Sequence, residues 1–438
     1  MGATEISFSY IIVALSIEGS LLLLRSLANV GDRIVESIPL LILSHILYLV
    51  AVFLVLRPAP PVISVRAILL IALVFRATIW PLYPALSDDV YRYRWEGKLQ
   101  AEGGNPYQTR PIDASWTQIR DQAFPHVGSK DFKSIYGPLI ELLERFTYWG
   151  VKQFSANPFV QVFWFKLPGA LFDLGIIGVL TLLLRQHGMP EILVLMYAWS
   201  PAAIVEFWGT GHNDSIPLFS ILLALLMAAR NRWIWAFGWL SVAVALKLWP
   251  IVLFPAFAFN KYGEGPRWYQ WMVLLPIAAS AAVPYLGNVT ENAQFLTGFV
   301  GGWRNNDSIF GGVLWLSGGD LYRAKYASMA IIGILTLAFA FFARRLETAV
   351  IATVVSVLLV SANCHPWYLT WFTPFLVFCP YLPLFLWSAL MPISYSVLIG
   401  WTTLQEWNGS TPLRWMIYGP VFGFALMHAA SHWIRRRR

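Results

Sequence analysis

The sequence predicts an all-α polytopic membrane protein with about 11–14 transmembrane helices. Of its 438 residues, 58% are hydrophobic and 12% are charged, whereas a soluble domain carries about 25% charged residues. The mean hydropathy is +0.59, so most of the chain is expected to lie in lipid. The apolar runs are continuous and do not alternate with polar residues, which argues against a β-barrel.

Apolar segments follow one another along the whole chain, some of them shorter than the roughly 20 residues that cross a bilayer. The predicted segments are 9–24, 38–56, 66–83, 159–184, 190–208, 215–229, 233–247, 249–260, 268–286, 326–344, 348–362, 366–380, 383–401 and 413–434. A break at Lys247–Pro250 predicts two short helices that meet at a kink, because proline ends or bends a helix. We treat residues 1–438 as a single integral membrane domain.

The basic residues gather at segment ends, which predicts the orientation of the chain. Placing these ends on the cytoplasmic side puts both termini in the cytoplasm of a prokaryotic plasma (inner) membrane. The ends are marked by Arg57, Arg66, Arg185, Arg230, Arg232, Lys261, Arg267, Arg344, Arg345 and the tail Arg435–Arg438. The net charge of +8 therefore indicates contact with the lipid bilayer, and no nucleic-acid partner is predicted.

Residues 84–158 form the largest polar stretch and are expected to be an extracytoplasmic, interfacial loop. Residues 89–102 suit a helix in which Tyr91, Trp95 and Leu99 share one face, as in an amphipathic helix at the membrane surface. A second helix is predicted from Tyr136-Gly137-Pro138 to about residue 154.

Asp88 and Asp89 stand where the apolar segment 66–83 ends, at the start of this loop. Carboxylates are costly near lipid, and two of them repel each other. The functional interpretation is a general base that accepts a proton from an acceptor hydroxyl. The second acid would orient the substrate or raise the pKa of the base by like-charge repulsion. The alternative is an N-cap followed by a solvated acid.

His212, Asn213 and Asp214 begin a later apolar segment on the same predicted side. They are interpreted as contacts to sugar hydroxyls or phosphate, and the alternative is a helix N-cap by Asn or Asp. No metal site is predicted, because no tight ligand spacing is present. The sequence leaves a requirement for a divalent metal open.

Three basic side chains are candidates for binding a donor phosphate. Lys247 lies inside an apolar run, where a buried cation needs an anion unless it snorkels to the interface. Arg304 lies on the predicted outer face, where the positive-inside rule requires no arginine. His365 precedes Pro366 and is equally well explained as a residue at a helix end.

Short motifs in the chain resemble those of the GT-C glycosyltransferases, most closely the mannosyltransferases that use polyprenol-phosphomannose. The motifs are Ser87-Asp88-Asp89-Val90-Tyr91-Arg92-Tyr93, Gly104-Asn105-Pro106-Tyr107, Tyr136-Gly137-Pro138-Leu139, Gly211-His212-Asn213-Asp214, Lys247-Leu248-Trp249-Pro250 and His365-Pro366-Trp367-Tyr368. The resemblance covers most of the chain in order and hydropathy and implies a GT-C-like bundle. The related mannosyltransferases favour Asp89 as the base and other GT-C enzymes favour Asp88, so we take Asp89 first and Asp88 second.

The resemblance implies an inverting transfer of a sugar, mannose by analogy, from a polyprenyl-phosphate donor to a glycan or glycolipid acceptor. Tyr91 and Tyr136 fall in its motifs and are predicted to contact substrate. No nucleotide-binding motif is present and no cofactor is predicted. The alternative is a transporter or flippase of a lipid-linked glycan that uses the carboxylates for proton coupling. A scaffold protein is the least favoured of the three interpretations, because a scaffold would not require a carboxylate pair on the outer face.

Overall fold

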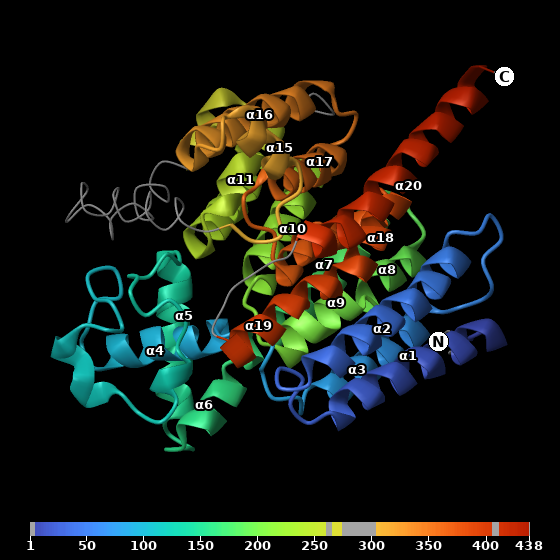
Figure 1. Ribbon diagram of the computed structural model, residues 1–438. Helices are drawn as coiled ribbons and strands as arrows, with labels where there is room; N and C mark the ends of the chain where they lie inside the picture. Colours follow the sequence, from blue (N-terminus) through green and yellow to red (C-terminus); the bar gives the residue numbers. More distant parts are fainter. Residues whose placement is uncertain (1–4, 260–264, 274–303, 405–410, 438) are drawn as a thin grey trace.

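The computed structural model describes residues 5–259, 265–273, 304–404 and 411–437. These residues are mostly helical (Figure 1), and within them β-type pairing is confined to two isolated bridges, Ile6 with Ile63 and Asn305 with Asn363. The all-α prediction is therefore confirmed. Residues 274–286 of the predicted segment 268–286 lie outside the described residues.

The first half of the chain contains the helices that surround the polar stretch. They are α1 (Phe8–Ser26), α2 (Ile34–Val55), α3 (Val65–Ile79), α4 (Asp89–Ala101), α5 (Pro138–Val151), α6 (Pro158–Trp164), α7 (Leu167–Gln186), α8 (Leu195–Ala198), α9 (Pro201–Ala203), α10 (Ser215–Ala229) and α11 (Trp233–Leu246). Shorter 3-10 and π-helical turns are η1 (Ala114–Ile119), η2 (Phe124–His126), η3 (Glu191–Val194) and η4 (Ile204–Gly209).

The second half continues with helices that are more often interrupted. They are η5 (Trp249–Leu253), α12 (Phe254–Ala258), η6 (Trp268–Val273), α15 (Ile309–Leu316), α16 (Leu321–Phe342), α17 (Leu346–Val360), η8 (Pro366–Trp371), η9 (Thr373–Val377), α18 (Leu382–Leu390), η10 (Met391–Ser396), α19 (Val397–Leu404) and α20 (Thr411–Arg437). Prolines begin several of these pieces, because proline lacks the N–H that would continue a helix.

Several helices have the length and composition of membrane spans. Among the described residues, five qualify: Phe8–Ser26, Ile34–Val55, Pro158–Gln186, Leu321–Phe342 and Leu382–Gly400. A sixth span results if Glu191–Ala198 and Pro201–Gly209, which are bent by 51°, count as one broken helix. Four further apolar helices of 10–17 residues are shorter than a span. The chain is thus a polytopic α-helical membrane protein, and the full number of spans stays a prediction.

One large apolar core joins α1–α3 to the helices that follow the polar stretch. A buried ion pair crosses this core: Arg76 of α3 donates to Asp173 of α7 over 2.6 Å, and neither side chain is exposed. Tyr197 and Trp208 also donate to Asp173, over 2.6 and 2.8 Å. These contacts tie α3 and α7 to the broken helix α8–η4, because a buried charge must have its partners satisfied.

Helices α4, α5 and α6 form a separate group beside the bundle (Figure 1), with its own small apolar cluster around Val90, Tyr93 and Tyr148. Helix α4 begins at Asp89, as predicted, and its buried residues lie on more than one face. It is therefore enclosed by protein. Helix α5 instead exposes Leu142, Phe146 and Trp149, which is the pattern expected of an interfacial helix.

Two short backbone contacts fix this group in place. Gly97 of α4 faces the carbonyl of Glu144 of α5 so closely that a Cβ at Gly97 would lie 2.3 Å from that oxygen. The N–H of Gly137, just before α5, donates to the carbonyl of Leu246 at the end of α11 over 3.1 Å. Glycine is needed at such close approaches, and together they hold the start of α4 against the bundle.

Candidate active site

The two predicted carboxylates have different surroundings. Asp89 is the first residue of α4, its N–H donates to the Ser87 hydroxyl over 3.2 Å, and its side chain is 30% exposed. Tyr93, one turn later, lies 3.5 Å from Asp89 Oδ2. Asp88 makes no side-chain capping bond and instead lies against Gly128. The N-cap explanation therefore does not account for Asp88.

Both carboxyl groups are harder to ionise than ordinary aspartates. Burial raises the pKa of Asp89, whereas the positive charges of His212 and Lys247 lower it. Burial of its carboxyl and, next, the charge of Asp89 raise the pKa of Asp88 to about 6, although the residue keeps an exposed surface. Raised carboxyl pKa values are common where a protein prepares a proton acceptor.

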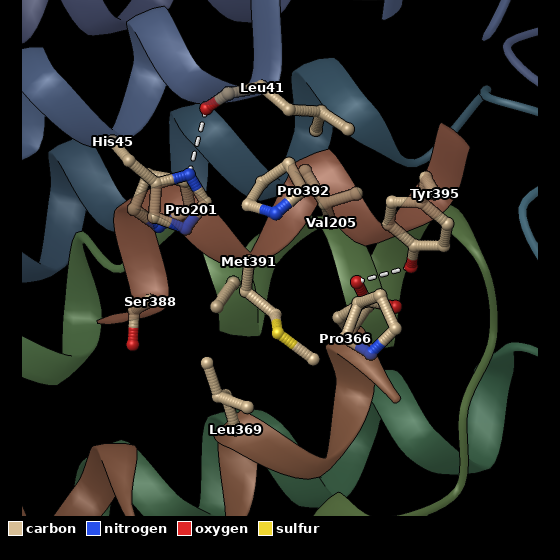
Figure 2. Close-up of a pocket in the computed structure, with 12 residues that line it drawn as sticks. Leu41, His45, Pro201, Val205, Pro366, Leu369, Ser388, Met391, Pro392 and Tyr395 are labelled. Atoms are coloured by element: carbon tan, nitrogen blue, oxygen red, sulfur yellow. Dashed lines mark hydrogen bonds between the residues drawn. The ribbon is translucent and has the colours of Figure 1, made fainter. Parts of the chain in front are cut away.

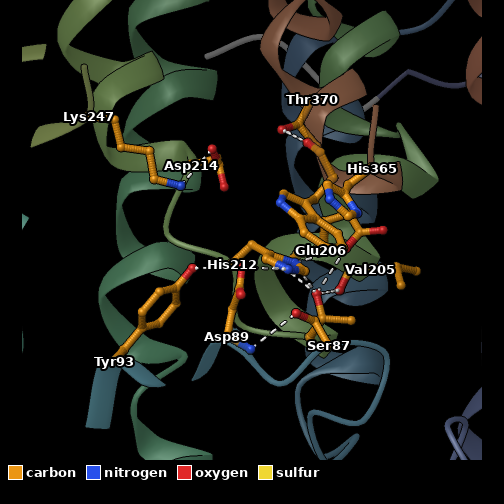
Figure 3. A network of polar contacts seen from close by, with 12 residues as sticks. Ser87, Asp89, Tyr93, Val205, Glu206, His212, Asp214, Lys247, His365 and Thr370 are labelled. Carbon is orange, nitrogen blue, oxygen red and sulfur yellow. Dashed lines mark hydrogen bonds and ion pairs between the residues drawn. The ribbon is translucent and has the colours of Figure 1, made fainter. Parts of the chain in front are cut away.

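His212 also faces Asp89, with its Nε2 atom 3.7 Å from Asp89 Oδ2 (Figure 3). The histidine is 1% exposed, and its Nδ1 contacts the Glu206 carboxylate at 3.1 Å and the Thr210 hydroxyl at 2.8 Å. His212 therefore connects Asp89 to an acid on the broken helix. The neighbouring Asn213 is buried, and no hydrogen-bond partner reaches its Oδ1 within the described chain.

Aromatic rings hold this part of the site together. Trp367 stacks on His212 with ring centres 4.3 Å apart, and His365 stacks on the other side of Trp367 at 4.5 Å. His365 Nδ1 also contacts the amide of Asn305 at 3.0 Å. Burial lowers the pKa of His365 to about 3, so its ring is neutral at physiological pH. His365 therefore lies at the site, where it can form hydrogen bonds but carries no positive charge.

Lys247 also reaches the site, and it is already paired. Its ammonium lies 2.8 Å from Asp214 Oδ1 and is 14% exposed, and Trp371 donates to the same oxygen over 2.8 Å. Asp214 makes no side-chain cap to α10, so the N-cap explanation fails here too. The ring of Tyr136 lies 5.9 Å from the Lys247 ammonium, which places this predicted substrate contact at the same site.

Arg304 and Tyr91 are engaged elsewhere. Arg304 is 37% exposed and forms a two-pronged ion pair with Asp307, whose carboxylate also accepts from Arg414 over 2.6 Å. The residue next to Arg304, Asn305, contacts His365 directly. Tyr91 stacks on His126 at 5.2 Å and so faces the loop. No described contact joins Tyr91 or Arg304 to Asp89.

Sequence reasoning missed Glu206. It lay inside the apolar segment 190–208, where a single acid is costly and marks a functional or paired position. That signal was available, but the partner His212 could not be inferred from it. No group of three or more His, Cys, Asp or Glu side chains in the described part of the chain is arranged to hold a metal ion. The absence of a cofactor stays a prediction.

Comparison with known proteins places these residues in a recognised family. A family model described as "Alpha-(1->6)-mannopyranosyltransferase, N-terminal domain" matches residues 4–262, a range that contains Asp88, Asp89, Glu206, His212, Asp214 and Lys247.

A curated relative, alpha-(1->6)-mannopyranosyltransferase A of Corynebacterium glutamicum, is 23% identical over 237 residues. The alignment covers 50% of this chain and 46% of the relative, so the chain spans about half the length of the curated relative it matches. Because the family model matches more than half of its residues, this chain belongs to the alpha-(1->6)-mannopyranosyltransferase family.

Proposed function

We propose that the protein is an inverting glycosyltransferase of the GT-C type that transfers mannose from a polyprenyl-phosphate donor. The acceptor is a hydroxyl of a lipid-linked or cell-envelope glycan. The observation that carries this proposal is the Asp89 carboxylate, partly exposed at the start of α4 and 3.7 Å from His212. Family membership supports mannose as the sugar.

The proposed reaction is a single displacement at the anomeric carbon. The acceptor oxygen forms a bond to this carbon while the bond to the donor phosphate breaks, and the electron pair leaves with the phosphate. Asp89 takes the acceptor proton, a step typically worth 10²–10⁴-fold in rate. A displacement from the face opposite the leaving group inverts the configuration of the sugar.

The departing phosphate gains negative charge and needs nearby cations. Lys247 is the first candidate, because it lies within electrostatic reach of Asp89 and keeps part of its surface exposed. Arg304 is the second, because it is the more exposed of the two. His212, Asn213, Asp214 and Tyr136 are proposed to contact the sugars.

The proposed location follows the charge distribution of the chain. We assign residues 84–158 and the site to the extracytoplasmic side of a prokaryotic plasma membrane, with both termini in the cytoplasm. The exposed apolar residues Leu142, Phe146 and Trp149 on α5 support a position of this loop at the lipid surface. Cysteine labelling from each side of the membrane tests the assignment.

The test of the reaction uses purified protein, a panel of polyprenyl-phosphate sugars and a glycolipid acceptor extract. Asp89→Asn is expected to lower turnover at least 100-fold, whereas Asp88→Asn, which changes the neighbouring acid, keeps most of the activity. Both variants should stay folded and inserted. Full activity of Asp89→Asn would refute the proposal. Movement of labelled lipid without a new glycosidic bond would indicate a flippase instead.

A further inference from the structure

Glu206 has donors on both carboxylate oxygens. Its Oε1 accepts from the Tyr395 hydroxyl over 2.7 Å. Its Oε2 lies 3.1 Å from His212 Nδ1 and 3.0 Å from the Thr210 hydroxyl oxygen. The residue is 4% exposed. Donors of this kind stabilise a charged carboxylate, and a buried charge needs such partners.

These contacts determine which nitrogen of His212 carries hydrogen toward Glu206. A charged carboxylate can only accept, and the Thr210 hydroxyl also lies 2.7 Å from the carbonyl of Glu206, to which it donates. His212 Nδ1 therefore donates to this pair. The ring cannot rotate freely, because Trp367 stacks on it with an angle of 16° between the planes. Its Nε2 atom is left facing Asp89.

The atom that faces Asp89 has no other partner. His212 Nε2 is buried and makes no hydrogen bond within the described part of the chain, and Asp89 Oδ2 lies 3.7 Å from it. Two unprotonated acceptors placed this way would repel each other. A proton on Nε2 removes the repulsion and gives an imidazolium between two carboxylates, Glu206 and Asp89.

We propose that Glu206 is a positioning residue for the base: through His212 it holds a positive charge beside Asp89 and keeps that carboxylate ionised. The inference rests on the proposed function, because it assigns Glu206 a part in proton abstraction by Asp89. Glu206 itself touches neither substrate nor the reacting atoms. A second helix thus takes part in preparing the base at the start of α4.

His212 is the main cation available for this task. Lys247 also lowers the pKa of Asp89, but its ammonium is paired with Asp214 at 2.8 Å. An opposite charge within about 4–6 Å changes a carboxyl pKa by roughly 1–3 units. The Asp214 carboxylate acts in the opposite direction and raises the pKa of Asp89. The other titratable groups facing Asp89, His212 or Glu206 are Asp88, Tyr93, Tyr136, Tyr368, His365, Tyr395 and His45.

His45 and Tyr395 line the small cavity behind Glu206 shown in Figure 2. His45 directs its Nδ1 to the carbonyl of Leu41 at 2.8 Å, and Tyr395 donates to Glu206. The tyrosine hydroxyl is therefore a partner of the Glu206 carboxylate on the side away from His212. This contact holds the carboxylate in place from that side.

The test is the pH dependence of kcat/KM for Glu206→Gln, His212→Gln and the double variant. In each single variant Asp89 loses the neighbouring positive charge, so its pKa rises and the acid limb of the profile moves to higher pH, by about one unit. The double variant should shift no further than the His212 variant. Glu206→Asp, which keeps the charge, should shift less than Glu206→Gln.

A matched control is Glu347→Gln. Glu347 contacts His187 Nε2 at 2.9 Å. His187 directly follows the last residue of α7. A helix of 20 residues is about 30 Å long, and His187 lies at the end of α7 that is farther from the site. This variant should leave the acid limb unchanged.

A uniform loss of rate at every pH in Glu206→Gln would show a structural role and overturn the inference. If Glu206→Gln fails to fold, the His212→Gln variant still tests the inference. An acid limb of its kcat/KM profile that does not move to higher pH would overturn the inference equally. Activity of Asp89→Asn would instead refute the proposed function, so the two failures are distinguishable.

Discussion

The ammonium of Lys247 lies 2.8 Å from Oδ1 of Asp214, where α11 ends and α10 begins. The sequence predicted a lipid phosphate as the partner of this lysine. The structure supplies an internal carboxylate, so the lysine is neutralised before any substrate arrives. A donor phosphate would have to share Lys247 with Asp214.

This pairing predicts how variants of Lys247 behave. Lys247→Met leaves Asp214 with Trp371 as its one side-chain donor among the described residues. It is expected to lower the free energy of unfolding by about 3–5 kcal/mol. Adding Asp214→Asn should recover most of that stability, because the uncompensated charge is gone. Thermal unfolding in detergent measures both. If Lys247 also binds phosphate, the stable double variant keeps a raised KM for the donor. A single variant as stable as the wild type would contradict the prediction.

The buried pair Arg76–Asp173 predicts a loss of stability with no direct effect on chemistry. Arg76→Met removes the cation beside Asp173 and leaves it, within the described part of the chain, the donors Tyr197 and Trp208. This should cost about 3–5 kcal/mol. The control is Arg33→Met, which breaks the exposed pair with Glu36 and should leave stability nearly unchanged, because solvent screens exposed ion pairs. Unfolding midpoints compare the two. Equal losses of stability in the two variants would show that burial does not determine the cost of breaking an ion pair in this protein.

Gly97 predicts a coupling between helix packing and activity. A methyl group at Gly97 would meet the carbonyl of Glu144 at 2.3 Å, so Gly97→Ala should push α4 away from α5 and move Asp89. A displacement of about 1 Å at a reacting group can cost 10²-fold in rate. Gly150→Ala on α5 is the control, because nothing lies within 4 Å of its Cβ; it should keep activity and stabilise slightly. Equal activity of the two variants would count against this packing argument.

Glu144 predicts an unusual pH dependence of stability. Burial, together with the charges of Glu141 and Glu96, raises the pKa of the Glu144 carboxyl well above its usual range. The folded state therefore retains a proton that the unfolded chain releases near pH 4.3. Stability contributed by this group is lost as pH rises from there toward the folded pKa.

Glu144→Gln should abolish this pH-dependent loss of stability, because the glutamine amide has no proton to release when the chain unfolds. The variant should melt a few degrees above the wild type at pH 8, and the two curves should converge toward pH 5. Glu102→Gln, at the end of the neighbouring helix α4, changes an exposed acid and should leave the melting temperature unchanged at both pH values. A Glu144 variant that melts below the wild type at pH 8 would contradict the argument.

Local pattern was sufficient for most of the helices. The predicted segment 215–229 has the bounds of α10, and the helix predicted for 89–102 is α4 (Asp89–Ala101), which ends where Gly103-Gly104-Asn105-Pro106 begins. Where prediction and structure differ, proline is usually present. The segment 366–380 became the 3-10 turns η8 and η9, because Pro366 and Pro374 each remove a helix hydrogen bond.

The candidate site could be predicted only in part. His212, Asp214, Lys247 and Tyr136 were singled out from short motifs, and the structure brings them near Asp89. Arg304 and Tyr91 were singled out in the same way and are engaged with Asp307 and His126. Nothing in the local sequence distinguishes these two outcomes, because ion pairs and ring stacking depend on partners distant in the chain.

Hydropathy and helix-terminating residues, both local properties, therefore determined by themselves that this chain is an all-α membrane protein with a polar stretch at 84–158. The tertiary structure decided which polar groups meet. Asp89 faces His212, whereas its neighbour Asp88 lies against Gly128, and Glu206 contacts His212 from a broken helix. The physical reason is that the cost of burying a charge is removed by partners that only the folded chain brings together.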